Sequence, residues 1–319
     1  MAKRQGFSPS AGEPQADVPR WTSGRECWVF RAETPDELCG HHPRLISSAL
    51  RPGELFHYLL YSPVFDAKGG PFRVVGVPGS HAVAITRDAL LVSRDLHTNE
   101  PGWSVARIAL DAVSCVEIGC ALALGWFVVR YAGSDGPASY PVLFRSRGTE
   151  HFRAIVRAYR RLGYEGPVEG KARLDWPTVW EETPTYVRTE LEPLVEETER
   201  PLAVLRTPEH WTVEKRWWGH RPVCTSAPGL LVATSLGLLW AASEPRRTPA
   251  GLSFGVNVTV VRRERVRGVA IGSRESLGVL RLKAGGKEAA HDLEVPFDGE
   301  DVASAEEIVH LARAWGVRV

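Results

Sequence analysis

The chain has 319 residues, which exceeds one ordinary domain, and it is almost neutral, with 39 Lys and Arg against 38 Asp and Glu. Its 44% hydrophobic and 24% charged composition is typical of a globular protein, and a net charge of +1 gives no global reason to expect a nucleic-acid partner. No run approaches the roughly 20 apolar residues of a membrane span. Five cysteines is an odd, sparse count that favours a reducing cytoplasm over a disulfide framework.

Residues 1–20 are rich in Pro, Gly, Ser and charge without the apolar core of a signal peptide, and we predict a disordered tail there. The first module follows over 21–166. It opens with a helical segment at 44–50. Thr149 is the expected N-cap of its closing helix, which Gly163 ends. Between these helices we predict seven strands, at 55–61, 82–86, 89–93, 105–110, 113–119, 126–131 and 140–145.

Residues 167–200 predict an acidic helical linker. Its 175–199 part carries eight acids against the single Arg188, with Val187, Leu191, Leu194 and Val195 at helical spacing. The second module, 201–319, repeats the plan of the first. Its final helix is expected to be capped by Ser304 and ended by Gly316. Its predicted strands are 202–206, 230–234, 238–241, 258–261, 266–272, 279–283 and 293–297.

The second half of the sequence repeats the first. Residues 108–164 align without a gap onto 261–317 at a constant offset of 153, and 13 of the 57 pairs are identical. The identical pairs are mainly apolar and glycine positions, which determine a core and its turns, so the duplicated property is a fold. Their first members are Val113, Val116, Ile118, Gly119, Leu124, Gly125, Gly133, Val142, Phe144, Ile155, Val156, Arg160 and Gly163.

This plan of seven short antiparallel strands and a closing amphipathic helix, with strand pairs at 84–91 and 232–239 and a strand at 108–119, resembles bacterial pleckstrin-homology (PH)-like domain proteins. Trp315 is similar to the tryptophan on the closing helix of eukaryotic PH domains, although the first module has Leu162 there. The resemblance implies an α+β, mainly β fold of two tandem PH-like modules. Each would be a seven-strand, partly open antiparallel barrel closed by a C-terminal helix. It also implies binding or assembly, because PH domains bind phosphoinositides, peptides or proteins.

One short stretch of the second module combines charge with tryptophan. It lies between the first two β-runs, where PH domains that bind phosphoinositides keep a basic loop. Guanidinium groups grip phosphate through paired donors, and tryptophan suits a membrane interface or a cation–π contact. The alternative is that the two tryptophans pack in the core. The candidate binding residues are Lys215, Arg216, Trp217, Trp218, His220 and Arg221.

The closing helix of the first module carries Arg153, Arg157, Arg160 and Arg161, spaced so that at least three project together. They form either a solvated face or a basic docking face for an acidic partner. The acidic 175–199 segment is an internal candidate for that partner, and arginine–carboxylate pairs there would join the two modules.

Two patterns have the right residue types for chemistry but the wrong context. Ser253 lies in a G-x-S-x-G sequence, yet a β-run follows where a nucleophile elbow needs a helix, so we expect a strand-connecting loop. Cys27, Cys39, His41 and His42 lack the spacing of a zinc site. The sequence therefore predicts no catalytic residue, no cofactor and no metal.

Together these observations predict a cytoplasmic, non-enzymatic binding or assembly protein that acts through a protein partner, without nucleic acid. Two alternatives stay open. One is binding of anionic lipid or phosphoinositide at the membrane surface, which would make the protein peripheral to the membrane. The other is a serine hydrolase using Ser253. The sequence does not fix the partner or the oligomeric state.

Overall fold

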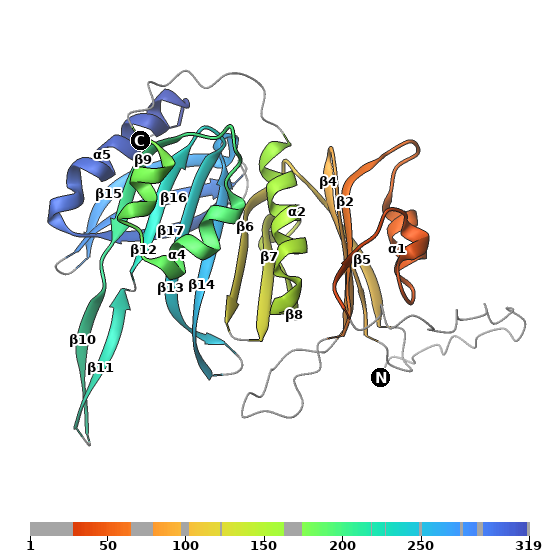
Figure 1. Ribbon diagram of the computed structural model, residues 1–319, viewed down its shortest axis with the longest axis horizontal. Coiled ribbons are helices and arrows are strands. Elements are labelled where there is room, and N and C mark those ends of the chain that lie inside the picture. The colour runs from red at the N-terminus through yellow and green to blue at the C-terminus, as the bar shows by residue number, and fades with distance from the viewer. Residues whose placement is uncertain are drawn as a thin grey trace, which may run out of the picture.

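The computed structural model describes residues 28–64, 79–96, 102–121, 123–162, 174–217, 219–226, 228–248, 251–274, 277–285 and 290–317. Within these ranges the protein is mainly β, with antiparallel sheets and five α-helices, as the sequence predicts at the level of fold class (Figure 1). The described strands form sheets that do not close into a barrel.

The described residues of the first module form eight strands and two α-helices. Strand β1 is a two-residue strand that extends the sheet beside β2. The strands are β1 (Phe30–Arg31), β2 (Phe56–Ser62), β3 (Ser80–Thr86), β4 (Ala89–Asp95), β5 (Trp103–Ala109), β6 (Val113–Ala121), β7 (Leu124–Gly133) and β8 (Gly136–Arg145). The helices are α1 (His42–Ala49) and α2 (Thr149–Arg161).

The acidic segment between the modules contains α3 (Trp176–Glu181), α4 (Thr185–Leu191) and a 3-10 turn at Glu192–Leu194. The second module ends with α5 (Val302–Ala314). Its strands are β9 (Pro201–Thr207), β10 (His210–Arg216), β11 (Gly219–Ser226), β12 (Gly229–Thr234), β13 (Gly237–Thr248), β14 (Gly251–Arg262), β15 (Val266–Arg274), β16 (Leu277–Gly285) and β17 (Ala290–Phe297).

The elements of the two modules correspond one to one over the aligned region. Strand β6 starts 153 residues before β15, β7 starts 153 before β16, and α2 starts 153 before α5. Helices α1 and α4 also correspond, since α1 packs on β4 and β5 while α4 packs on β13 and β14. The second module has the β10–β11 hairpin between β9 and β12, and the corresponding part of the first module, residues 65–78, lies outside the described ranges.

One sheet passes through both modules. Its seven strands follow the order β8-β7-β6-β14-β13-β12-β9, so the first module contributes three neighbouring strands and the second contributes four. The junction is the antiparallel pair β6–β14, in which Ile118 faces Val258 and Gly119 faces Asn257. A backbone ladder therefore joins the modules directly, in addition to the covalent linker.

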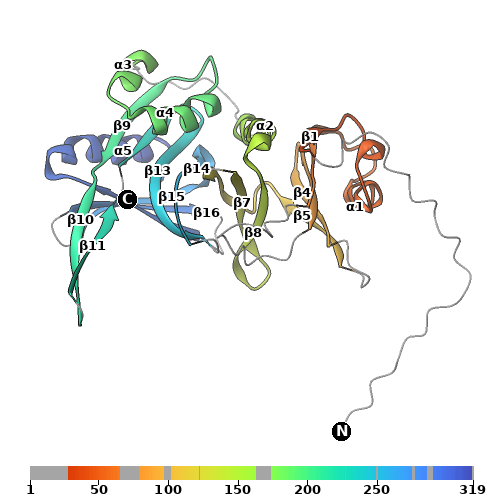
Figure 2. The same ribbon diagram turned by 60° about the horizontal axis from the view of Figure 1, so that its bottom comes forward.

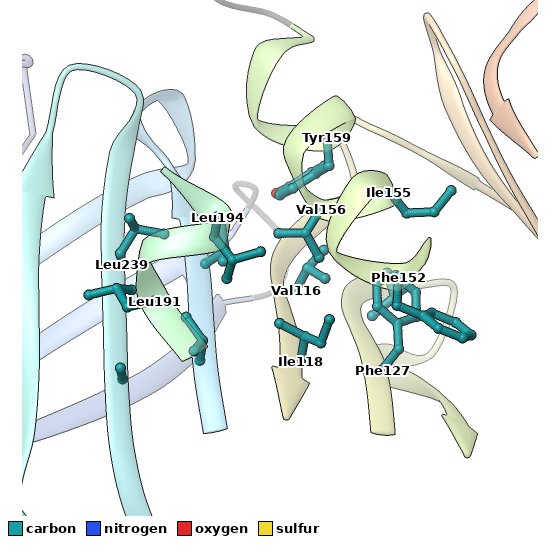
Figure 3. Packing of buried hydrophobic residues seen from close by; sticks show 14 of the residues in the cluster. Val116, Ile118, Phe127, Phe152, Ile155, Val156, Tyr159, Leu191, Leu194 and Leu239 are labelled. Carbon is teal, nitrogen blue, oxygen red and sulfur yellow. The ribbon is translucent and has the colours of Figure 1, made fainter. Parts of the chain in front are cut away.

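The largest core also belongs to both modules. It gathers buried side chains from α2, β6 and β7 with Leu239 of β13 and with Leu191 and Leu194 of the acidic segment (Figure 3). Each of those three leucines is fully buried. The apolar positions of the acidic segment thus pack between the modules, where their burial stabilises the junction.

A repeated contact explains why glycine and phenylalanine positions match between the modules. Gly125 pairs with Phe144 across β7 and β8, and Gly278 pairs with Phe297 across β16 and β17. In both pairs the phenylalanine ring lies over the glycine, and a Cβ there would overlap the ring. The ring needs the space, so the two residues are duplicated as a unit.

Several helix ends differ from the sequence expectation. Helix α2 has Gly148 at its N-cap, and Thr149 is its first residue, because the Thr149 hydroxyl donates to the Ser146 carbonyl in the preceding 3-10 turn. Helix α5 starts at Val302, so Ser304 lies inside it. Gly316 follows the end of α5 with φ +78°, a conformation that favours glycine.

Candidate functional site

The second module carries a two-stranded hairpin, β10–β11, which extends away from the body of the molecule in both views (Figures 1 and 2). Among the described strands, β10 and β11 pair with each other and with no third strand. Trp217 lies at the turn with 91% of its surface exposed, the highest value for any large hydrophobic residue described. A two-stranded hairpin without a third strand is only marginally stable in water. This hairpin also presents an exposed aromatic residue on an extended arm, and exposed apolar surface often marks a contact site.

Five of the six sequence-predicted binding residues lie at the end of this hairpin: Lys215, Arg216, Trp217, His220 and Arg221. Lys215 and His220 are opposite each other in the ladder, as are Glu214 and Arg221, while Arg216 faces Gly219. Trp218 lies outside the described residues. The expectation of a loop here was wrong in one respect, because the strand pairing continues to Arg216 and Gly219. Gly219 has φ +142°, which suits the turn.

The acidic segment covers the arginine face of α2. Arg153 Nη2 donates to Glu190 Oε2 at 2.7 Å and to the Thr189 carbonyl at 3.2 Å. Arg157 donates to the Pro193 carbonyl at 2.6 Å. Arg161, the most exposed of the four, pairs with Glu196. Arg153, Arg157 and Arg161 lie on successive turns of α2 and together hold the acidic segment to the first module.

Arg160 makes the most buried contact of this set. It donates to the Glu199 carboxylate and to the Leu194 carbonyl, with its side chain 2% exposed and that of Glu199 0% exposed. Glu199 also accepts from the Glu196 amide at 3.1 Å, which closes a short turn before β9. We call the Glu199 carboxylate and the Leu194 carbonyl the arginine socket of the second module.

The first module has a matching socket that the sequence analysis did not identify. Glu54 accepts from the Arg51 amide at 2.9 Å, as Glu199 does from Glu196, and the turn again precedes the first long strand. Arg107 of β5 donates to both Glu54 oxygens at 2.8 Å and to the Ala49 carbonyl at 3.0 Å. The guanidinium in this socket therefore comes from within the same module.

The pKa of Glu54 follows from this arrangement. Hydrogen bonds from Arg107, and secondarily from the Thr86 hydroxyl, stabilise the ionised carboxylate against the opposing effect of burial and lower its pKa to about 2. Arg107 is the single charged residue of β5, and nothing near it in the sequence indicates its role. The sequence signal that relates the two sockets is the match of Glu54 to Glu199 at an offset of 145.

The other candidate chemistry is dispersed. Ser253 lies in β14, opposite Arg246 in β13, so the prediction that Ser253 lies in a loop was wrong. Fully buried His42 contacts Ser93 Oγ at 2.7 Å and Ser80 Oγ at 2.8 Å through its two ring nitrogens. His41 contacts Asp95 instead, at 2.9 Å, and Cys27 lies outside the described residues.

Among the described residues, no three His, Cys, Asp or Glu side chains gather as metal ligands. Burial raises the pKa of the Cys115 thiol to about 12 and that of Cys120 to about 11, the latter with the help of Glu190. Both thiols are protonated at neutral pH, and the thiolate is the nucleophilic form. The described helices include none with the length and apolar character to cross a bilayer.

No protein-family model matches the chain, and no curated protein matches it.

Proposed function

We propose that the chain is a non-enzymatic interaction and assembly protein of two tandem PH-like modules, and that the β10–β11 hairpin is its partner-binding arm. The exposed Trp217 at the turn is the single observation that carries the assignment. Aromatic residues with large exposed area are the side chains that most often anchor protein interfaces. The repeated order of seven strands and a closing helix supports the PH-like assignment.

The chemistry around the hairpin favours a protein partner of acidic character. Four of the six residues predicted to bind are cationic or titratable to cations, and they lie on both strands next to Trp217. The β-ladder fixes these positions relative to one another, which lowers the entropy lost when a partner binds. The same residues could contact anionic lipid, so the experiment separates the two partners.

The test compares wild-type protein with Trp217→Ala, using Tyr186→Ala as the control. Tyr186 is also an exposed aromatic residue, at 45%, but it lies on α4 away from the hairpin. We expect proteins captured from the cell of origin to lose binding by about 10-fold or more in Trp217→Ala, as for an interface anchor, and to keep it in Tyr186→Ala. Equal capture by all three proteins would contradict the hairpin assignment.

Charge reversal of Arg216 and Arg221 should weaken binding to an acidic protein and lower the salt dependence of that binding, because fewer ionic contacts remain to be screened. A second measurement tests lipid binding with vesicles of phosphatidylcholine, with and without phosphatidylserine. Salt-sensitive sedimentation with the phosphatidylserine vesicles, lost in Trp217→Ala, would instead assign the arm to anionic lipid.

A further inference from the structure

The junction between the modules joins two strands that hold different places in the repeat, β6 and β14. Among the seven strands that the two modules share, β2–β8 and β9 with β12–β17, the fifth strands are β6 and β15, and the fourth strands are β5 and β14. Inside the chain, the fifth strand of the first module pairs with the fourth strand of the second. The duplication therefore leaves one fifth strand, β15, and one fourth strand, β5, without this partner.

Both of those edges are open in the described part of the chain. There β5 has β4 as its ladder partner on one side only, and β15 has β16 on one side only. An unpaired strand edge is a template for another strand. Each edge also carries an exposed large hydrophobic residue, Trp103 on β5 at 46% and Ile271 on β15 at 42%.

A groove beside β15 repeats the surface that is covered in the first module. It has a volume of about 340 Å³ and lies between β15 and α5. Its lining residues are Ile271, Glu306, Val309, His310 and Arg313. Shifted back by 153, these positions are Ile118, Arg153, Val156, Arg157 and Arg160, which β14, the shared core and the acidic segment cover inside the chain.

We propose that copies of this chain join head to tail, with β15 of one copy pairing antiparallel with β5 of the next in the register of the internal β6–β14 junction. Shifting that register by 153 places Val105 opposite Ile271, as Val258 lies opposite Ile118. It also places Ser104 opposite Gly272, as Asn257 lies opposite Gly119. The occupant of the β15 edge is thus a second copy of this chain.

The internal junction supports a second copy as the occupant, because β5 of a second copy is the counterpart of the strand that pairs with β6 inside the chain. The charges of the two junctions differ. Inside the chain Arg153 meets Glu190 and Arg161 meets Glu196, whereas the positions on α5 that correspond to Arg153 and Arg161 are Glu306 and Ala314. The outer junction therefore does not repeat these two ion pairs.

The outer junction is weaker than the internal one. Arg160 fills the socket of the second module, whereas Arg107 already fills the socket of the first. Arg313, which corresponds to Arg160, therefore finds Glu54 paired. The outer contact relies on strand pairing and apolar burial, so we expect reversible association. Because its two sides are different surfaces, it leads to open chains unless the rotation closes a ring.

A comparison of Gly119 with its counterpart Gly272 gives a variant that should block the outer junction and leave the single copy folded. A Cβ on Gly119 would overlap the Trp126 ring and approach the Val256 carbonyl across the junction at 2.6 Å. A Cβ on Gly272 would meet only the Arg281 guanidinium, at an ordinary 3.7 Å. Gly272→Val is therefore accepted by the single copy, but it blocks the approach of a neighbouring β5.

The experiment measures mass by sedimentation equilibrium over protein concentrations from about 1 µM to about 500 µM, a range that covers weak contacts. We expect the wild-type weight-average mass to rise beyond that of a dimer. Gly272→Val, Ile271→Glu and Val105→Glu should each remain monomeric, with circular dichroism spectra like that of the wild type. Mixing Ile271→Glu with Val105→Glu should restore dimers and nothing larger, because that mixture retains one intact β5 edge and one intact β15 edge per pair.

A wild-type protein that stays monomeric up to the highest concentration would overturn the proposal. So would association that survives Gly272→Val and both edge charges. Association abolished by Trp217→Ala but kept by the edge variants would overturn it too, and would move self-contact to the hairpin. The hairpin proposal has its own partner and variants, so either proposal can fail alone.

Discussion

Arg107 and Arg160 lie on different elements, yet each donates to the glutamate of a corresponding turn and to a main-chain carbonyl just before it. Arg107 reaches Glu54 from the strand of its own module, and Arg160 reaches Glu199 from the helix of the other module. The same socket is thus filled from within in one repeat and from the neighbour in the other. This difference makes the second module dependent on the first.

Replacing Arg160 should test that dependence. We expect Arg160→Met to lower the free energy of unfolding by about 3–5 kcal/mol, because it leaves the fully buried Glu199 carboxylate without its cation. Urea denaturation measures the change. Arg161→Met is the control, since its side chain is 68% exposed and such pairs contribute about 1 kcal/mol or less. Equal losses in both variants would contradict a special role for the buried pair.

The first socket predicts a pH dependence. The Glu54 pKa is lowered from 4.5 to about 2, so its contribution to stability is full above pH 4.5 and is lost as the pH falls towards 2. The difference in unfolding free energy between wild type and Glu54→Gln should shrink over that window. Denaturant titrations at several pH values measure it. If the difference in unfolding free energy stays constant from pH 5 to pH 2.5, Glu54 has the same pKa in the folded and unfolded states, and the prediction is wrong.

The glycine–phenylalanine pairs predict a reciprocal rescue. Gly125→Ala and Gly278→Ala should each destabilise by about 1–3 kcal/mol, because the new methyl group overlaps the facing ring. Adding Phe144→Leu to Gly125→Ala should recover part of the loss. Gly272→Ala is the matched control for Gly278→Ala, because Gly272 also lies in a strand of the second module and the atom nearest to its added Cβ is 3.7 Å away. Thermal denaturation of the four proteins distinguishes overlap from a general intolerance of alanine.

Much of the fold follows from the sequence because its signals are local. Each of the fourteen expected strands falls within a strand of the structure or overlaps one, and the apolar side of α2 is set by residues such as Phe152 and Tyr159 at helical spacing. The aligned glycines are explained by single contacts, such as Gly125 with Phe144. Such patterns are visible in one stretch of chain.

The misses share a physical cause, which is that they depend on segments far apart in sequence. The pairing of Ile118 with Val258 joins positions 140 residues apart, and no local pattern specifies which strand edge meets which. The β10–β11 hairpin was expected as a loop because its basic and bulky residues hide the alternation of a strand. Ser253 was assigned to a loop because β13 and β14 continue beyond their apolar parts.

A common core predicts that the modules unfold together. Leu194 belongs to the segment between them and is fully buried against both. Leu194→Ala should cost about 2–5 kcal/mol and accelerate hydrogen exchange in β3 and in β12 alike. Mass spectrometry of peptides from the two strands measures this. Faster exchange restricted to one module would show that the halves open independently.

The continuous sheet also fixes geometry. Where most tandem modules are joined by a hinge, a hydrogen-bonded ladder from β7 through β6 and β14 to β13 holds these two in one orientation. Strand β8 of the first module and strand β9 of the second form the two edges of this sheet, so their separation is fixed by the ladder between them. A target that contacts both edges forms its second contact at an effective concentration determined by the shape of the sheet and not by the length of a linker.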